Sequence, residues 1–321
     1  MRKVLFLTVM ILVIIVGAVC ANGGQEGESK GTIVFADMNW DSIQVHNRIA
    51  KHIIEDGLGY TTEFTQGSTI NSVTALIQGD IDVVMESWTE NIQELYDKGI
   101  ESGSIIDLGN NFSDSAQGWY VPTYMIEGDK ERGIEATAPN LEHVKDLPEY
   151  WELFKDPEDP KKGRIYIGVP GWKATEMSRE KMEKYNLTET YNEFIPGSDA
   201  ALAGSMIGAY KKGNPWLGYY WEPTWVMGKV DMTLLEGSQF PPNQVNILVY
   251  KTLPDRAPDV VEFFKNYETS SAINNEFLAV MADNELTTDE AAVWFLKNRQ
   301  DVWTEWVSSE VEEKVKASLE G

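Results

Sequence analysis

Short apolar runs alternate with amphipathic stretches over the first part of the chain. The runs at 32–36, 60–64 and 81–85 are rich in β-branched and aromatic residues and predict strands. The stretches at 43–56 and 69–78 carry apolar residues at helical spacing and predict helices. Strands and helices in this strict alternation are typical of a mainly parallel sheet. Ligands of such sheets bind beyond the carboxyl ends of the strands.

The rest of the chain adds strands and then a helical end. Extended segments are predicted at 118–126, 164–169, 219–222 and 245–250, the first and last of which cross between lobes. Further helices are predicted at 91–98, 141–147, 149–154, 174–185, 199–211, 258–268, 270–283, 288–298 and 301–319. We therefore expect an α/β protein of two lobes, each a mainly parallel sheet flanked by helices, with a two-segment hinge. Lobe 1 takes residues 31–125 and 245–321, and lobe 2 takes residues 126–244.

The first twenty residues have the pattern of an export signal. Arg2 and Lys3 precede a run without charged residues that extends from 4 to 19 and ends in small residues. An uncleaved membrane anchor is the alternative for so long a run. With either interpretation the working protein lies outside the cytoplasm.

The only cysteine, Cys20, stands at the end of this run. The stretch from 17 to 20 resembles the lipobox of bacterial lipoproteins, and residues 21–30 form a polar, glycine-rich tether. We expect lipidation at Cys20, and ordinary cleavage between small residues is the alternative. In both cases no thiol is left for a disulfide or a thiolate site.

The charge balance is strongly acidic. The net charge is −24, and without Arg2 and Lys3 the chain keeps 25 basic against 51 acidic residues, or −26. Such a balance repels nucleic acid and anionic lipid but is compatible with a cationic or zwitterionic ligand. The three histidines, His46, His52 and His143, lack metal-ligand spacing, and the sequence contains neither a P-loop nor a Gly-x-Ser-x-Gly elbow. We predict no catalytic residues, no metal and no cofactor.

Three of the eleven tryptophans share one setting, just beyond a predicted strand. They occur in Met85-Glu86-Ser87-Trp88, Val169-Pro170-Gly171-Trp172 and Tyr219-Tyr220-Trp221-Glu222-Pro223. Rings from two lobes that face one cleft can surround a quaternary ammonium group, which has no N–H and must be held by π faces. Each ring contributes about 0.5–2 kcal/mol. Packing in the core is the alternative for these rings.

Other groups extend this candidate site. Trp40 and Trp119 are candidates for a fourth wall, with core packing as the alternative for each. Gly171 and the free backbone N–H groups at the start of the helix after Trp172 favour an anion site beside the ring. Trp294, Trp303 and Trp306 lie on predicted helices and are expected in the core.

The motifs resemble those of the glycine betaine/proline betaine-binding proteins of bacterial ABC importers. The resemblance is carried by Ser87-Trp88-Thr89, Pro170-Gly171-Trp172 and the segment from Tyr219 to Trp225, and it covers the chain from about residue 31. It implies a type II-like periplasmic-binding-protein fold and a ligand held between the lobes and delivered to a membrane permease. It also implies a cage of Trp88, Trp172 and Trp221, with backbone N–H groups of Lys173 and Ala174 on the ligand carboxylate.

Two departures from the family pattern leave the ligand open. Some relatives have a histidine one helical turn after the first cage tryptophan, where this chain has Ile92; Asn91, Gln93 or the Lys173 side chain are the alternatives. Glu222 beside the cage favours a more cationic ligand such as choline, unless it points to solvent.

We expect a monomer that binds glycine betaine or proline betaine. Choline, carnitine, trimethylamine oxide and a sulfonium osmolyte are alternatives within the same fold. A secreted hydrolase with an aromatic cleft, a sugar-binding protein and a structural surface lipoprotein are the rival classes.

Overall fold

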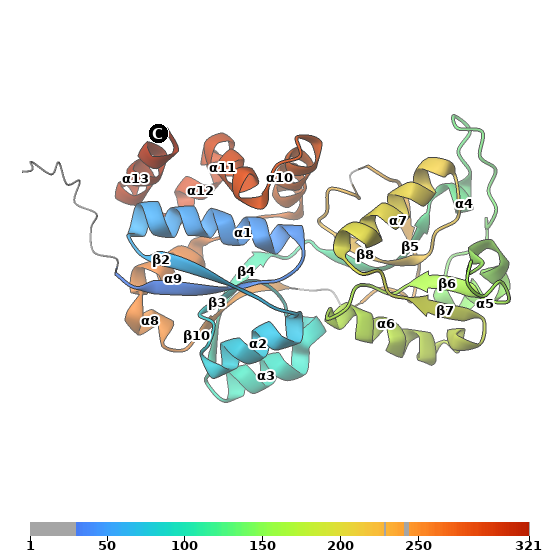
Figure 1. Cartoon of the computed structure of the whole chain (residues 1–321), viewed down its shortest axis with the longest axis horizontal. Helices are drawn as coiled ribbons and strands as arrows, with labels where there is room; N and C mark the ends of the chain where they lie inside the picture. The colour runs from blue at the N-terminus through green and yellow to red at the C-terminus, as the bar shows by residue number, and fades with distance from the viewer. Residues whose placement is uncertain (1–29, 228, 241–243, 321) are drawn as a thin grey trace, which may run out of the picture.

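Two lobes, each built on a five-stranded sheet, lie side by side in the computed structural model (Figure 1). The structure describes residues 30–227, 229–240 and 244–320. The predicted signal at 1–20, Cys20 and residues 21–29 of the tether lie outside these residues.

The first sheet has the strand order β2-β1-β3-β10-β4. Its strands are β1 (Thr32–Asp37), β2 (Thr61–Gln66), β3 (Val83–Trp88), β4 (Ile105–Phe112) and β10 (Val245–Tyr250). The strand β1 is parallel to β2 and β3, whereas β10 is antiparallel to β3 and β4. The strand β10 therefore lies between β3 and β4, although in sequence it follows all the strands of the second sheet.

The second sheet has the order β7-β6-β8-β5-β9. Its strands are β5 (Ala116–Pro122), β6 (Gly163–Tyr166), β7 (Tyr191–Phe194), β8 (Gly218–Glu222) and β9 (Met232–Leu234). The strand β6 is parallel to β7 and β8, and β5 is antiparallel to β8 and β9. The two sheets thus have the same mixed design.

Helices cover both faces of the first sheet. On one side lie α1 and the C-terminal helices, and on the other lie α2 and α3 (Figure 1). Their bounds are α1 (Asp41–His52) with a π-helical turn η1 (Ile53–Leu58), α2 (Thr69–Gln78), η2 (Thr89–Ile92), α3 (Gln93–Glu101), α8 (Leu253–Arg256), α9 (Pro258–Asn266), α10 (Ser271–Asp283), α11 (Thr288–Asn298), α12 (Gln300–Trp303), η6 (Thr304–Trp306) and α13 (Ser309–Glu320). The core under α1 includes Trp303 and Trp306, where they were expected.

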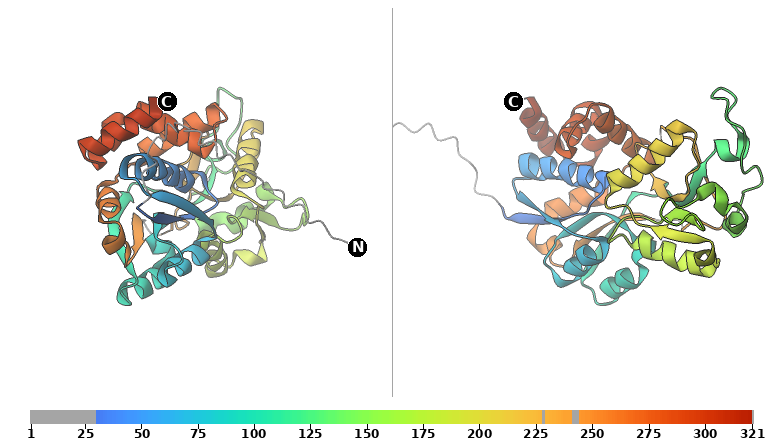
Figure 2. Two further views of the ribbon diagram at one scale, coloured as in Figure 1. Left: turned by 60° about the vertical axis from the view of Figure 1, so that its left-hand side comes forward. Right: turned by 45° about the vertical axis from the view of Figure 1, so that its right-hand side comes forward.

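Two longer helices, α6 and α7, flank the second sheet (Figure 1). The helical elements of this lobe are α4 (Tyr124–Glu127), η3 (Val144–Asp146), α5 (Leu147–Tyr150), η4 (Trp151–Phe154), α6 (Lys173–Lys184), η5 (Leu187–Glu189) and α7 (Asp199–Lys212). The start of α6 lies against the first lobe in each view (Figures 1 and 2). The hydrophobic core of the second lobe is continuous with buried residues of the first lobe, so the two lobes are closed on one another.

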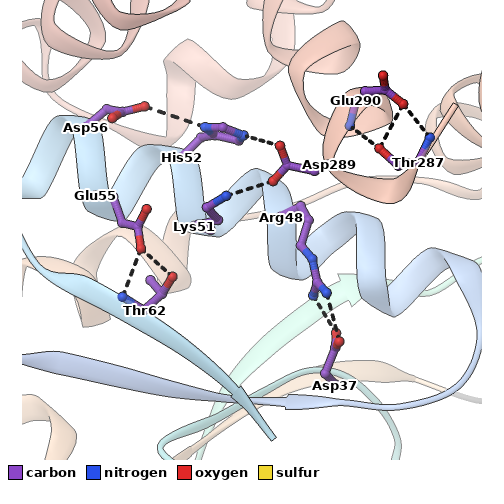
Figure 3. Close-up of polar contacts among 10 residues, drawn as sticks. All are labelled: Asp37, Arg48, Lys51, His52, Glu55, Asp56, Thr62, Thr287, Asp289 and Glu290. Carbon is purple, nitrogen blue, oxygen red and sulfur yellow. Dashed lines mark hydrogen bonds and ion pairs between the residues drawn. The ribbon is translucent and has the colours of Figure 1, made fainter. Parts of the chain in front are cut away.

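Ion pairs fix α1 to the elements around it (Figure 3). Asp37, at the end of β1, is fully buried and accepts two hydrogen bonds from the Arg48 guanidinium, at 2.6 and 2.9 Å. Lys51 and His52 on the next turn both face Asp289 of α11. These contacts hold in place the helix whose first turn reaches the cleft.

The structure corrects the lobe boundary. The strand β5 belongs to the second sheet, whereas the boundary at residue 125 assigned it to lobe 1. The chain changes sheets between β4 and β5, at 113–115, and not at the segment 118–126. Strands that enter from the other lobe join antiparallel, which is why each sheet is mixed and not mainly parallel.

Three strands escaped the sequence analysis. The strand β4 contains Gly109 and two asparagines, residues depleted from strands, yet it pairs along its length with β10. The strands β7 and β9 have four and three residues. The helix predicted at 301–319 is divided into α12, η6 and α13, because a break near Val307 turns Trp306 into the core. Among the described residues, no helix has both the length and the apolar character needed to cross a membrane.

Candidate functional site

One pocket lies between the lobes and is walled mainly by aromatic rings. Lobe 1 contributes Met38, Trp40, Thr69, Val73, Glu86, Ser87, Trp88 and Asn91, and lobe 2 contributes Trp172, Lys173, Ala174, Tyr219 and Trp221. The space between the walls, open solvent included, is about 490 Å³. An aromatic lining with a few polar groups is usual for a site that takes a small molecule.

Strand ends and helix starts place the rings. Trp88 is the last residue of β3, and Trp40 immediately precedes α1. Tyr219 and Trp221 are two apart on β8, so both side chains leave the same face of the strand. Trp172 immediately precedes α6. The rings therefore stand on regular elements and not on long loops.

The rings meet edge to face around Trp172. The centroid of Trp172 is 6.0 Å from that of Trp40, with planes at 85°. Its centroid is 4.9 Å from that of Trp221, with planes at 88°. Tyr219 stacks on Trp221 at 6.0 Å and 19°. Rings at right angles present faces in several directions, as a cage around a compact cation requires.

A buried carboxylate lies among the rings. Glu86 Oε1 accepts the indole N–H of Trp40 at 2.8 Å and that of Trp88 at 2.9 Å. Glu86 is 1% exposed, and its Oε2 has no hydrogen-bond partner among the described residues. Burial raises the pKa of Glu86 to about 7, and the nearby Ser42 hydroxyl and the indole N–H groups of Trp88 and Trp40 oppose this rise. This acid thus orients two walls and keeps one oxygen free.

The first turn of α6 supplies backbone donors. Lys173 and Ala174 both line the pocket, and the first N–H groups of a helix have no intrahelical acceptor. Gly171 has a φ of 87°, and a Cβ at this position would lie 2.8 Å from Cβ of Ser68 in the other lobe. Glycine therefore allows both the turn before Trp172 and the close approach of the lobes. The Lys173 ammonium pairs with Glu176.

An amide network stands where some relatives have a histidine. Ile92 is buried in the core and does not line the pocket, but its neighbour Asn91 does. Asn91 and Gln117 exchange two hydrogen bonds, and the Tyr219 hydroxyl donates to Gln117 at 2.8 Å. Gln93, another candidate, is exposed and bonded to Asp97. Of the three candidates, Asn91 and Lys173 line the pocket, and the Lys173 ammonium is paired with Glu176.

The structure separates the remaining candidates. Trp40 is a wall of the pocket. Trp119 is not: it is fully buried in lobe 2, and its indole N–H donates to Ser178. Glu222 is half-buried and does not line the pocket, although burial raises its pKa. Trp119 thus takes the core position that was its alternative, and Glu222 lies outside the pocket.

The sequence analysis missed Glu86 and Tyr219. Both stand inside motifs that it quoted, each two residues before a cage tryptophan. Period-two alternation along a strand carried the signal, because residues two apart share a face. Within the described ranges, no group of three or more His, Cys, Asp and Glu side chains is placed to hold a metal ion.

The chain is similar to known proteins over most of its length. A family model described as the substrate-binding domain of ABC-type glycine betaine transport systems matches residues 31–298. The trimethylamine N-oxide-binding protein of Pelagibacter ubique is 20% identical over 320 residues, covering 95% of this chain and 99% of that protein. The glycine betaine/proline betaine-binding periplasmic protein of Escherichia coli is 23% identical over 279 residues, covering 78% and 82%.

Solved structures share the fold. An ABC-transporter choline-binding protein in complex with choline has a TM-score of 0.75 and 21% identity, covering 90% of this chain and 98% of that one. This likeness confirms the expected two-lobe periplasmic-binding-protein fold.

Proposed function

The chain belongs to the family of substrate-binding domains of ABC-type glycine betaine transport systems, and we propose that it captures a small methylated ammonium solute between its lobes. The family is one of transport proteins and not a class of enzymes. The resemblance expected from the three tryptophan motifs is thereby confirmed.

The observation that carries the proposal is the convergence of Trp40, Trp88, Trp172, Tyr219 and Trp221 on one pocket. A trimethylammonium group has no N–H, so hydrogen bonds cannot hold it and aromatic faces can. A sugar would need several side-chain hydrogen-bond partners, and most polar groups here are already bonded to one another.

The backbone N–H groups of Lys173 and Ala174 would receive the carboxylate of a betaine ligand. Glycine betaine and proline betaine are the first ligands to test, since the E. coli relative is named for them. Choline and trimethylamine oxide follow, because a similar structure contains choline and the Pelagibacter relative is named for the oxide. Carnitine and sulfonium analogues belong to the same chemical class.

Capture outside the cytoplasm and delivery to a membrane permease complete the proposal. The E. coli relative is named a periplasmic protein, and residues 1–20 have the pattern of an export signal. Lipidation at Cys20 would keep the protein at the membrane. Closure of the lobes on the ligand is the state that a permease would recognise.

Calorimetric titration of the purified protein tests the proposal, with tryptophan fluorescence as a second readout. Saturable binding of glycine betaine or choline, weakened several-fold at least in Trp172→Ala, is the expected result. Binding of maltose, with neither methylated amine bound, would overturn it.

A further inference from the structure

Glu86 places an ionisable carboxyl group in a pocket where a zwitterionic ligand requires no counter-charge. The pocket is lined by a single carboxylate, that of Glu86, and by one basic residue, Lys173, whose ammonium pairs with Glu176. The hydrogen bonds to Glu86 come from neutral groups, the indoles of Trp40 and Trp88. Among the described residues its charge is therefore not matched by a protein cation.

The surroundings of Glu86 are otherwise neutral. Tyr267 is a buried phenol within electrostatic range of this carboxylate, and it is hydrogen-bonded to His46. Burial lowers the pKa of His46 to about 3, so this imidazole is uncharged at neutral pH. A buried carboxylate with a free oxygen costs free energy unless a cation comes close to it.

We propose that Glu86 is the counter-charge of the bound ligand and makes the cage prefer methylated amines with a net positive charge, such as choline, over zwitterionic betaines. This inference rests on the proposed function and names the substrate class of the same site. The sequence hypothesis gave this effect to Glu222; the structure assigns it to Glu86, because Glu86 lines the pocket and Glu222 does not.

The charges of the two ligand classes explain why choline should bind more tightly than a betaine. Both ligand classes present a quaternary nitrogen to the rings, so the cation–π part of binding is shared. A betaine also brings its own carboxylate, which is repelled by Glu86 and compensates the ammonium. Choline brings an unopposed positive charge, which is attracted to the carboxylate in a site of low dielectric.

A purely structural role for Glu86 predicts something different. Its Oε1 orients Trp40 and Trp88, so any disturbance of the two rings should weaken all ligands together. Glu86→Gln separates the roles, because the amide oxygen still accepts both indole N–H groups while the charge is removed.

The test measures Kd by calorimetry for three probes: choline, glycine betaine and 3,3-dimethyl-1-butanol, the uncharged carbon isostere of choline. In Glu86→Gln we expect the ratio of choline to isostere affinity to fall by at least about tenfold. The ratio of choline to betaine affinity should fall in the same direction. Glu222→Gln is the matched control and should leave both ratios unchanged.

Each outcome decides a separate question. Equal losses for all three probes in Glu86→Gln would overturn the counter-charge and leave Glu86 as a support of the rings. A fall in the ratios caused by Glu222→Gln alone would return the role to Glu222. Failure of the unaltered protein to bind either methylated amine would instead reject the proposed function itself.

Discussion

The indole N–H of Trp172 donates a hydrogen bond to the side-chain oxygen of Asn39, with 2.8 Å between Nε1 and Oδ1. Asn39 follows β1 in the first lobe, and Trp172 precedes α6 in the second. One ring of the candidate cage therefore also forms a hydrogen bond between the lobes. Ligand contact and lobe closure are coupled through a single side chain.

Asn39→Ala should remove this hydrogen bond between the lobes and leave all the rings of the cage in place. A neutral hydrogen bond contributes about 0.5–1.5 kcal/mol, so we expect affinity to fall about 2- to 10-fold. The loss should be in the dissociation rate, because closure keeps the ligand in place. Stopped-flow tryptophan fluorescence measures this rate. Trp172→Phe should show little further loss when added to Asn39→Ala, and full additivity would contradict the coupling.

Trp172→Ala and Trp303→Ala should separate binding from stability. Trp172→Ala removes a π face worth about 0.5–2 kcal/mol together with the hydrogen bond to Asn39, so binding should weaken several-fold at least. Trp303 is fully buried in the core of the first lobe, and its truncation should cost about 3–5 kcal/mol of unfolding free energy. Calorimetry and urea unfolding measure the two quantities. Equal affinities of the two variants would reject the site.

Choline affinity should rise with pH. Because burial raises the pKa of Glu86 to about 7, this acid is largely protonated at pH 6 in the free protein and ionised at pH 8. A bound cation favours the ionised form, so binding releases a proton at pH 6 and affinity increases by up to about tenfold between pH 6 and pH 8. Calorimetry in buffers of different ionisation enthalpy measures the released proton directly.

Glu86→Gln provides the control for this pH dependence. Choline affinity should then no longer rise over this range, and a fall would come from Asp199, an acid behind Trp221 whose pKa is also raised to about 7 by burial. A slope that persists in this variant would assign the titration to another group.

Much of the site was visible in the sequence because its rings sit at the ends of regular elements. The positions of Trp88, Trp172 and Trp221 followed from strand patterns and from Pro-Gly and Glu-Pro breaks. Trp119 could not be separated from Trp40, because both are isolated tryptophans next to an extended segment. Only tertiary packing distinguishes them: one ring meets Trp172 across the cleft, and the other meets Ser178 in the core.

The boundary between the lobes could not be predicted from local sequence patterns, because it also depends on tertiary pairing. The strand β5 has the composition of any buried strand, and sequence alone does not say which sheet it joins. Its register with β8, which pairs Gln117 with Trp221 and Trp119 with Tyr219, is a long-range choice. The strand β4, which precedes the crossing between the sheets, has too few apolar residues to be recognised from the sequence.

Arg48→Ala should lower the unfolding free energy of the first lobe more than Lys51→Ala, a substitution one helical turn away on α1. Asp37 is fully buried, and without the guanidinium it keeps only the amides of Asn47 and Gln66 as side-chain donors. Breaking a buried pair costs about 3–5 kcal/mol. The pair of Lys51 and Asp289 is partly exposed and should cost under about 1 kcal/mol. Urea unfolding measures both, and equal losses would contradict the assigned role of Asp37.

A pair of acids faces each other across the lobes behind Trp221. Asp41 begins α1 and Asp199 begins α7, and both line a small space that also includes Tyr220 and Trp221. Burial, and then the charge of Asp41, raises the pKa of Asp199 to about 7, and burial raises the pKa of Asp41. Neither Lys, Arg nor His lines this space among the described residues.

Asp199→Asn should therefore stabilise the protein at pH 8 and have little effect near pH 4. An acid whose pKa is higher in the folded state keeps its proton there, so its contribution to stability declines as pH rises from about 4 to 7 and stays low above that range. The amide removes this loss, although it also gives up the favourable position of a carboxylate in the first turn of α7. Thermal unfolding of both proteins at pH 4, 6 and 8 measures the difference, with a substitution of the exposed Glu193 on the edge strand β7, Glu193→Gln, as control. A Tm difference between Asp199→Asn and the unaltered protein that does not grow from pH 4 to pH 8 would show that the charge of Asp199 does not destabilise the folded protein.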